Sequence, residues 1–137
     1  ALLQAGAPEI RLSNRTRAKA EMLADAFGEN VKVIEWSERS SALASCGLLV
    51  NTTSLGMTGQ PALDIVLEDL PSTAVVYDIV YSPLETPLLA AARARGNQGV
   101  DGLGMLLHQA TPGFEAWFGV KPVVDTTLRD VILADLT

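Results

Sequence analysis

The stretch Glu9-Ile10-Arg11-Leu12-Ser13-Asn14-Arg15-Thr16 decides the fold of this 137-residue chain. Its first four residues are typical of a short β-strand. The polar residues after them lead into Arg17–Phe27, where apolar residues recur at helical spacing. Gly28 ends this predicted helix, and Val31–Ile34 has the composition of a second strand. A strand, a helix and a second strand at this spacing predict a βαβ unit.

The same alternation of strands and helices continues through the rest of the chain. Gly47–Val50 is uniformly apolar, which predicts a central strand buried on both faces. We therefore predict an α/β fold, with a Rossmann-like parallel sheet and helices on both faces, as a single domain over residues 1–137. The predicted strands are Glu9–Leu12, Val31–Ile34, Gly47–Val50, Ala74–Val80 and Gln98–Val100. The predicted helices are Arg17–Phe27, a short one over Ser40–Ser45, Pro87–Arg95 with Thr86 as its N-cap, a long helix from the turn Asp101–Gly104 to Phe118, and residues 125–136.

The composition narrows the possible partners. The net charge is −6 and the basic residues are mostly scattered, which argues against a general nucleic-acid-binding surface. No uncharged stretch reaches the roughly 18 to 20 apolar residues that a membrane span needs. The single Cys46 cannot form an internal disulfide and suits a reducing compartment, so we expect a cytoplasmic protein. Four basic residues nevertheless fall close together: Arg11, Arg15, Arg17 and Lys19.

The junction between the first strand and the first helix predicts the cofactor. In Rossmann-type domains an Asp or Glu at this point accepts hydrogen bonds from the adenosine ribose and selects NAD, whereas an Arg pairs with a 2′-phosphate and selects NADP. Arg15 stands here and no acid does, so we predict NADP. The alternative is that Arg15 and Lys19 belong to an ordinary solvated helix face.

A glycine-rich phosphate loop is missing from the sequence. A complete dinucleotide-binding domain begins with a strand and a glycine-rich turn, and no G-x-G-x-x-G run occurs here. Residues 1–8 look like the last two turns of a helix, stopped by Gly6 and Pro8. We therefore expect the domain to be partial at its N-terminus, lacking its first βα unit.

Three motifs in fixed order identify a family. They are Asn14-Arg15-Thr16 with Lys19, Asn51-Thr52-Thr53-Ser54-Leu55-Gly56-Met57, and Asp101-Gly102-Leu103-Gly104-Met105 with Gln109. Together with the tract Tyr77–Pro83, this ordered set resembles the C-terminal NADP-binding half of shikimate dehydrogenase over practically the whole chain. Asn-Arg-Thr alone is a weak signal, because glutamyl-tRNA reductases carry similar runs. The resemblance implies reduction of 3-dehydroshikimate to shikimate by hydride transfer from NADPH, a step of aromatic amino acid biosynthesis.

The resemblance also implies which residues bind the cofactor. Arg15 would bind the 2′-phosphate, Ile79 would pack against the nicotinamide, and Gly102 would lie beside its carboxamide. The whole implied set is Asn14, Arg15, Thr16, Lys19, Asn51, Thr52, Thr53, Ser54, Ile79, Gly102 and Met105. Each member has a structural alternative, since an Asn/Ser/Thr run is a common turn, Ile79 suits any buried strand, and Gly102 suits any tight turn.

Substrate contacts are implied for Tyr81 and Gln109, with a structural tie as the alternative for Gln109. No catalytic residue is predicted. His108 has no orienting carboxylate at a recognisable spacing, and the acids and Cys46 form neither a metal site nor a nucleophilic triad. In the family, a Lys and an Asp of an N-terminal substrate domain handle the proton. We therefore expect this chain alone to be inactive, and residues 125–136 to pack towards that domain.

Two rival functions remain open. One is a quinate or quinate/shikimate dehydrogenase, against whose NAD-using branch Arg15 argues. The other is a non-catalytic cofactor-binding or sensor module of the same family. Tyr81 and Gln109 favour an enzyme, because a nucleotide sensor has no need of substrate ligands.

Overall fold

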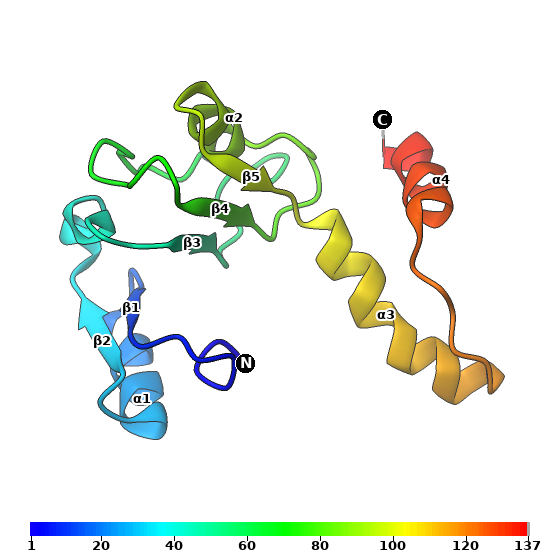
Figure 1. The fold of residues 1–137 in the computed structure, drawn as a ribbon, viewed down its shortest axis with the longest axis horizontal. Helices are drawn as coiled ribbons and strands as arrows, with labels where there is room; N and C mark the ends of the chain where they lie inside the picture. The colour runs from blue at the N-terminus through cyan, green and yellow to red at the C-terminus, as the bar shows by residue number, and fades with distance from the viewer. Residues whose placement is uncertain (137) are drawn as a thin grey trace. The chain divides into compact units, whose positions relative to one another are not determined.

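The computed structural model describes residues 1–136, which form two compact units (Figure 1). Unit 1 comprises residues 1–46 and 65–71, and unit 2 comprises residues 47–64 and the chain from residue 72 onwards. Each unit contains its own parallel sheet. The predicted α/β class is confirmed, but the strands lie in two sheets, each within its own unit.

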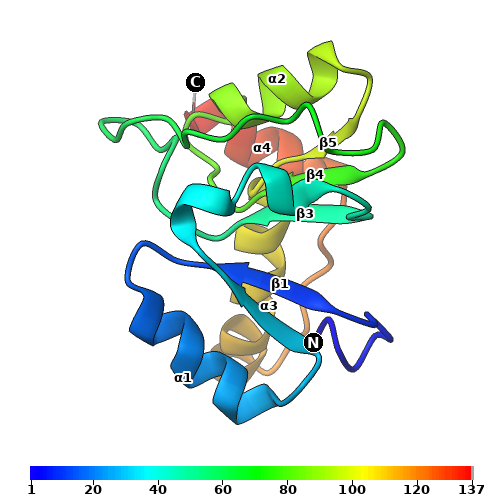
Figure 2. The same ribbon diagram turned by 90° about the vertical axis from the view of Figure 1, so that its left-hand side faces the viewer.

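Unit 1 is built around a βαβ motif. Strand β1 (Ile10–Ser13) pairs in parallel with β2 (Val31–Ile34), and Ile10 lies opposite Val31. Figure 2 shows the two strands side by side, with helix α1 (Arg17–Phe27) packed against both. Gly28 ends α1 as predicted, and its N–H donates to the carbonyl of Ala24 over 2.8 Å. The predicted helix at Ser40–Ser45 is a short 3₁₀ turn, η2 (Ser41–Leu43), preceded by another, η1 (Trp36–Glu38).

The first residues differ from the prediction. Hydrogen-bonded turns occupy the segment expected to be the end of a helix. One α-helical bond forms, from the N–H of Ala5 to the carbonyl of Ala1; the bond from Gly6 to Leu3 closes a tighter turn, and the bond from Ala7 to Leu2 closes a wider one. One hydrogen bond of this type does not nucleate a helix, because it fixes several residues for a single bond.

Unit 2 contains three parallel strands in the order β3-β4-β5. These are β3 (Leu48–Asn51), β4 (Val75–Asp78) and β5 (Gln98–Val100). Helix α2 (Pro87–Ala94) packs against β4 and β5, and Thr86 caps it by accepting a hydrogen bond from the N–H of Leu89. Helices α3 (Leu103–Phe118) and α4 (Thr126–Leu136) follow and contact each other.

The core of unit 2 lies around β4. Val76 and Leu89 are fully buried, and Leu103 at the start of α3 is as well. The prediction that Gly47–Val50 forms a central strand is wrong for the described residues, because β3 is an edge strand and Leu48 is 40% exposed. An apolar run indicates burial, but it does not specify which strands pair.

The part of the chain that the structure describes has no helix long and apolar enough to cross a bilayer. In the same residues, no group of three or more His, Cys, Asp or Glu side chains could hold a metal ion.

Candidate cofactor site

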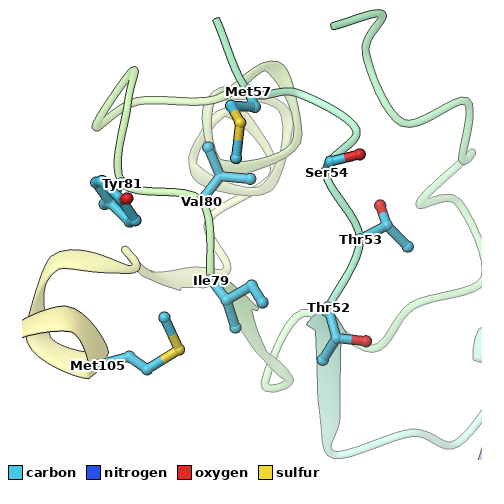
Figure 3. A pocket seen from close by; sticks show the side chains of 8 residues that line it. All are labelled: Thr52, Thr53, Ser54, Met57, Ile79, Val80, Tyr81 and Met105. Carbon is cyan, nitrogen blue, oxygen red and sulfur yellow. The ribbon is translucent and has the colours of Figure 1, made fainter. Parts of the chain in front are cut away.

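A pocket of about 230 Å³ lies in unit 2, where β3 and β4 end (Figure 3). The carboxyl ends of parallel strands are where open α/β sheets bind ligands. Three segments form its walls, namely the loop after β3, the segment after β4 and the first turns of α3. The lining residues are Thr52, Thr53, Ser54, Met57, Ile79, Val80, Tyr81 and Met105.

Six residues that the sequence predicts for the site meet in this pocket. Cofactor contacts were predicted for Thr52, Thr53, Ser54, Ile79 and Met105, and a substrate contact for Tyr81. The pocket also contains Met57 and Val80, which were not predicted. Met57 ends the Asn51–Met57 motif and Val80 follows Ile79, so the motifs held the signal for both. The roles of the individual residues stay predictions.

Gly102 connects the start of α3 to the end of β4. Its N–H donates to the carbonyl of Val80 over 3.1 Å. A Cβ atom on residue 102 would lie 2.0 Å from the carbonyl oxygen of Ile79, so no larger residue fits without displacing the backbone. Met105, one turn further along α3, lines the pocket together with Ile79. Gln109 lies one more turn along the same side of α3 and is exposed.

Asn51 organises the loop after β3. Its amide nitrogen donates to the Leu55 carbonyl and to a carboxylate oxygen of Asp78, each over 3.0 Å. Its amide oxygen accepts from the N–H of Thr53 over 3.0 Å and from the Thr53 hydroxyl over 2.8 Å. These four bonds use the hydrogen-bonding capacity of the Asn51 side chain. Thr52 and Ser54 are the exposed hydroxyls of this loop.

Asp101 joins three elements at the edge of the sheet. Its carboxylate accepts from the N–H of Leu103 over 3.1 Å and from the Arg129 guanidinium of α4 over 2.6 Å. Burial raises the pKa of Tyr77 above its usual value of 10.0, and the negative charge of Asp101 raises it further.

A second cluster of predicted residues lies in unit 1, at the N-terminus of α1. The side-chain oxygen of Asn14 accepts from the N–H of Thr16 over 3.0 Å, which fixes the turn before the helix. The Thr16 side chain makes no capping bond, and the first turn of α1 contains no acid. Arg15 and Lys19 are exposed, and within residues 1–136 neither pairs with an acid or donates a side-chain hydrogen bond.

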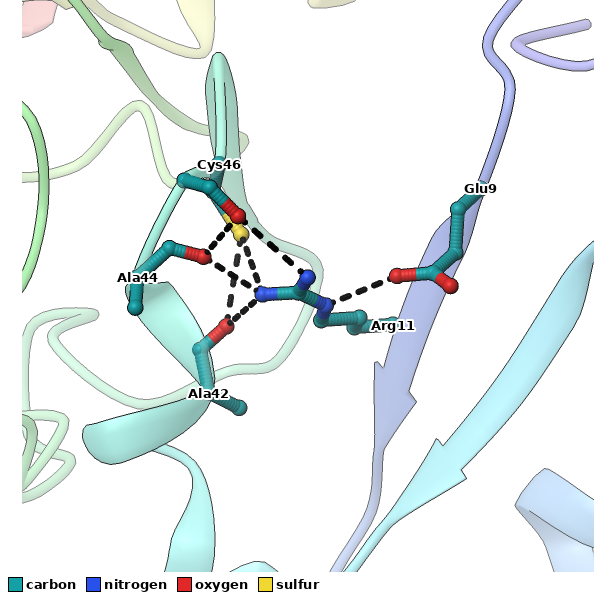
Figure 4. Close-up of polar contacts among 6 residues, drawn as sticks. Glu9, Arg11, Ala42, Ala44 and Cys46 are labelled. Carbon is teal, nitrogen blue, oxygen red and sulfur yellow. Dashed lines mark hydrogen bonds and ion pairs between the residues drawn. The ribbon is translucent and has the colours of Figure 1, made fainter.

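The other two basic residues of the predicted cluster are already engaged. The Arg11 guanidinium donates to the carbonyls of Ala42 and Ala44 over 2.7 and 2.6 Å, and to Glu9 over 2.8 Å (Figure 4). The hydrogen bond to Glu9 is the main reason that the pKa of Arg11 is raised.

Arg17 pairs with Glu21 over 2.6 Å and with Glu35. Its pKa is raised, chiefly by the hydrogen bond to Glu21. Arg15 and Lys19 are therefore the free cations of the cluster in the described chain.

His108 and Cys46, for which the sequence predicts no catalytic role, lie outside the pocket. His108 is exposed on α3, and its carbonyl accepts from the Thr111 hydroxyl over 2.9 Å. Cys46 is partly buried and donates to the carbonyl of Ala42 over 3.3 Å.

Parallel strands linked by crossover helices, with a pocket at their carboxyl ends, define a Rossmann-like α/β domain. Comparison with known proteins relates this domain to one family. The profile of the Shikimate 5′-dehydrogenase C-terminal domain matches residues 102–129. The NADP(+)-dependent shikimate dehydrogenase of Paramagnetospirillum magneticum is 61% identical over 134 residues, which cover 98% of this chain and 49% of that protein.

Solved structures agree with the sequence matches. Quinate dehydrogenase from Corynebacterium glutamicum in complex with NAD superimposes with a TM-score of 0.86 at 31% identity, covering 98% of this chain and 49% of that one. Shikimate 5-dehydrogenase from Thermus thermophilus in complex with NADP(H) and shikimate gives a TM-score of 0.73 at 33% identity, covering 90% and 44%. The chain is homologous to the C-terminal domain of the shikimate dehydrogenase family. It spans about half the length of the curated relatives it matches.

Proposed function

We propose that this chain is the NADP-binding part of a shikimate dehydrogenase, which reduces 3-dehydroshikimate to shikimate with NADPH. The observation that carries the proposal is the pocket after β3 and β4, which gathers six predicted site residues in a chain 61% identical to an NADP(+)-dependent shikimate dehydrogenase. When bound, NADPH supplies the hydride, and the protein supplies binding and orientation.

The N-terminus of α1 suits the 2′-phosphate of the cofactor. Arg15 and Lys19 are exposed and unpaired among the described residues, and no acid in the first turn of α1 opposes an anion. Backbone N–H groups at a helix N-terminus also attract phosphate oxygens. A guanidinium can bind phosphate through two parallel hydrogen bonds, which favours NADP over NAD.

The pocket of unit 2 suits the nicotinamide and the substrate. Ile79 and Met105 present apolar surfaces for one face of a flat ring, and Thr52 and Ser54 present hydroxyls to ribose and phosphate oxygens. Tyr81 orients a substrate hydroxyl at the other side of the pocket, and Gln109 reaches the same substrate from α3.

The proposal includes a partial domain at the N-terminus. The doubly wound dinucleotide fold has the strand order 3-2-1-4-5-6. Without strand 1 this order separates into the pair 3-2 and the triplet 4-5-6. The sheets β2-β1 and β3-β4-β5 have the same grouping, which supports a missing first βα unit.

A further domain would supply the proton-transferring Lys and Asp. Several large apolar residues are exposed at the end of α3 and in the segment before α4, among them Trp117 at 81% and Val123 at 75%. Exposed apolar groups of this size are typical of surfaces that contact another domain. We propose that α4 and the end of α3 face the N-terminal substrate domain.

A second candidate is a quinate dehydrogenase, which the TM-score of 0.86 to such an enzyme in complex with NAD favours. Assays of the full-length protein separate the two. We expect NADPH to be oxidised with 3-dehydroshikimate much faster than NADH, and much faster than with 3-dehydroquinate. Preference for NADH or 3-dehydroquinate would establish the second candidate. Cofactor binding without turnover of either substrate would establish the non-catalytic module.

A further inference from the structure

We propose that Asp78 is a positioning residue, which sets the spacing between the pocket walls that follow β3 and β4 through a buried network with Asn51 and Thr86. The inference rests on the proposed function of the pocket. Asp78 does not line the pocket, and no role was predicted for it or for Thr86 at the site. The three side chains are 0%, 3% and 1% exposed, so the network is out of reach of ligands.

The network begins where the two pocket strands end. Asn51 and Asp78 are the last residues of β3 and β4 and lie opposite each other in register. Their side chains are joined by the 3.0 Å hydrogen bond from Asn51 to Asp78. The residues that follow these two directly in the chain are Thr52 and Ile79. Those two residues line the pocket.

Asp78 also connects the strands to α2. Its second carboxylate oxygen accepts from the Thr86 hydroxyl over 2.7 Å, and that hydroxyl accepts from the N–H of Leu89 over 3.2 Å. Its first oxygen accepts from the N–H of Val80 over 3.1 Å, which fixes the backbone of the pocket wall after β4. One carboxylate therefore links both pocket walls to the first turn of α2.

The loop after β3 closes over the same network. Gly56 has a φ of +93°, a backbone conformation that residues with a side chain rarely adopt. A Cβ atom on residue 56 would lie 3.6 Å from the Cβ atom of Thr86 and 4.0 Å from the carboxylate of Asp78. The loop that carries Thr52, Thr53 and Ser54 is thus held at its start by Asn51, and near its end the buried Gly56 donates its N–H to the Pro61 carbonyl over 2.8 Å.

The network requires an acceptor at both oxygens of residue 78. The donors are the Val80 N–H, the Asn51 amide and the Thr86 hydroxyl, and no basic side chain pairs with Asp78 among the described residues. An Asn at position 78 has the same shape but accepts at one atom. Its NH₂ group would face the Thr86 hydroxyl, whose proton then loses its acceptor. Buried groups without a partner are costly, so the walls would shift apart or rearrange.

The test separates positioning of the pocket from general stability. NADPH carries both the nicotinamide proposed for the pocket and the 2′-phosphate proposed for Arg15, whereas adenosine 2′,5′-bisphosphate carries the 2′-phosphate without the nicotinamide. In the full-length protein, we expect Asp78→Asn to raise the Kd of NADPH by about tenfold or more, as the loss of a charged hydrogen bond would. The Kd of adenosine 2′,5′-bisphosphate should stay within about twofold, since its subsite lies in unit 1.

A matched pair of variants covers the case in which Asp78→Asn does not fold. Thr86→Val removes the hydroxyl and should reproduce the selective loss of NADPH binding. Thr86→Ser keeps the hydroxyl and should bind NADPH as the wild type does. The control is Asn97→Ser. Asn97 is 4% exposed and donates to the Ala74 carbonyl over 2.9 Å, just before the start of β4. It should lower the melting temperature without changing the ratio of the two Kd values.

Each outcome of these binding measurements either supports or overturns the positioning role of Asp78. Selective loss of NADPH binding in the Asp78 or Thr86→Val variant supports the inference. Unchanged NADPH binding, or equal loss of both ligands as the melting temperature falls, overturns it. If the wild-type protein binds neither ligand, the proposed function fails and the inference fails with it. That outcome is distinguishable because it appears before any substitution is made.

Discussion

The backbone at Gly102 approaches the carbonyl oxygen of Ile79 so closely that a Cβ atom would lie 2.0 Å from it. The φ of Gly102 is −78°, which any residue adopts, so the requirement for glycine is steric. Because Ile79 lines the pocket, this approach fixes the distance between the end of β4 and the first turn of α3.

Replacing Gly102 by Ala should therefore destabilise the protein. Forcing a methyl group against this backbone should cost about 1 to 3 kcal/mol of the free energy of unfolding, measured by urea denaturation. Gly104→Ala is the matched control, since a methyl group on residue 104 would have no neighbouring atom within 4 Å and alanine is the better helix former. Equal losses in the two variants would contradict the steric argument.

The substitution Arg15→Ala should weaken NADPH binding selectively. Loss of a charge-assisted phosphate contact should cost about 1.5 to 3 kcal/mol of binding free energy, while NADH binding stays unchanged. Titration calorimetry of the full-length protein measures both. Arg17→Ala removes the same charge two residues away, but Arg17 pairs with Glu21 and Glu35, so it should affect NADPH binding far less. Similar effects of the two variants would mean that net charge alone attracts the cofactor.

Arg11 should matter for stability and not for the cofactor. Arg11→Met keeps the apolar stem but removes the guanidinium hydrogen bonds to the carbonyls of Ala42 and Ala44. These carbonyls keep the Cys46 thiol and the Ser45 hydroxyl as side-chain donors. We expect a loss of about 1 kcal/mol in the free energy of unfolding, reduced from larger values by the partial exposure of the site. Thermal unfolding measures this loss, and the Kd of NADPH should stay as in the wild type. A weaker Kd at unchanged stability would place Arg11 in the phosphate site.

Tyr77 should titrate above the usual pKa of a tyrosine. Burial is the larger cause and Asp101 the smaller, so Asp101→Asn should lower the pKa of Tyr77 only part of the way towards 10.0. The absorbance of tyrosinate follows the titration, with Tyr77→Phe to assign the signal against Tyr81. Because the folded pKa is raised, Tyr77 adds stability below its unfolded pKa, and this is lost as the pH rises through the folded pKa. A pKa of Tyr77 at or below 10.0 would contradict the effect of burial.

Local sequence signals predicted the elements well. The helix Arg17–Phe27 and the strands Val31–Ile34 and Gln98–Val100 have the predicted bounds, because capping residues and periodicity act within a few residues. Strand pairing is not local. The apolar run of β3 therefore suggested a central strand, and the structure has it at an edge.

The same distinction holds for the candidate site. Motifs identified most of the pocket lining, since each motif is contiguous in sequence. The network of Asp78 was missed because Asn51 lies 27 residues away, and no spacing rule connects the two. The sequence could not show which cations of the basic cluster are free to bind an anion. Arg11 is bound by carbonyls 31 and 33 residues away, and Arg17 pairs with Glu35.

The division of the strands into a pair and a triplet also has a consequence for handling the protein. In the described chain β1 pairs with β2 alone and β3 with β4 alone, so each has a row of backbone donors and acceptors with no neighbouring strand. Such rows act as templates for other chains, and a two-stranded sheet has little stability of its own. At high concentration the 137-residue chain should therefore be prone to intermolecular β-pairing and precipitation, and dilute samples will be the ones that behave as monomers.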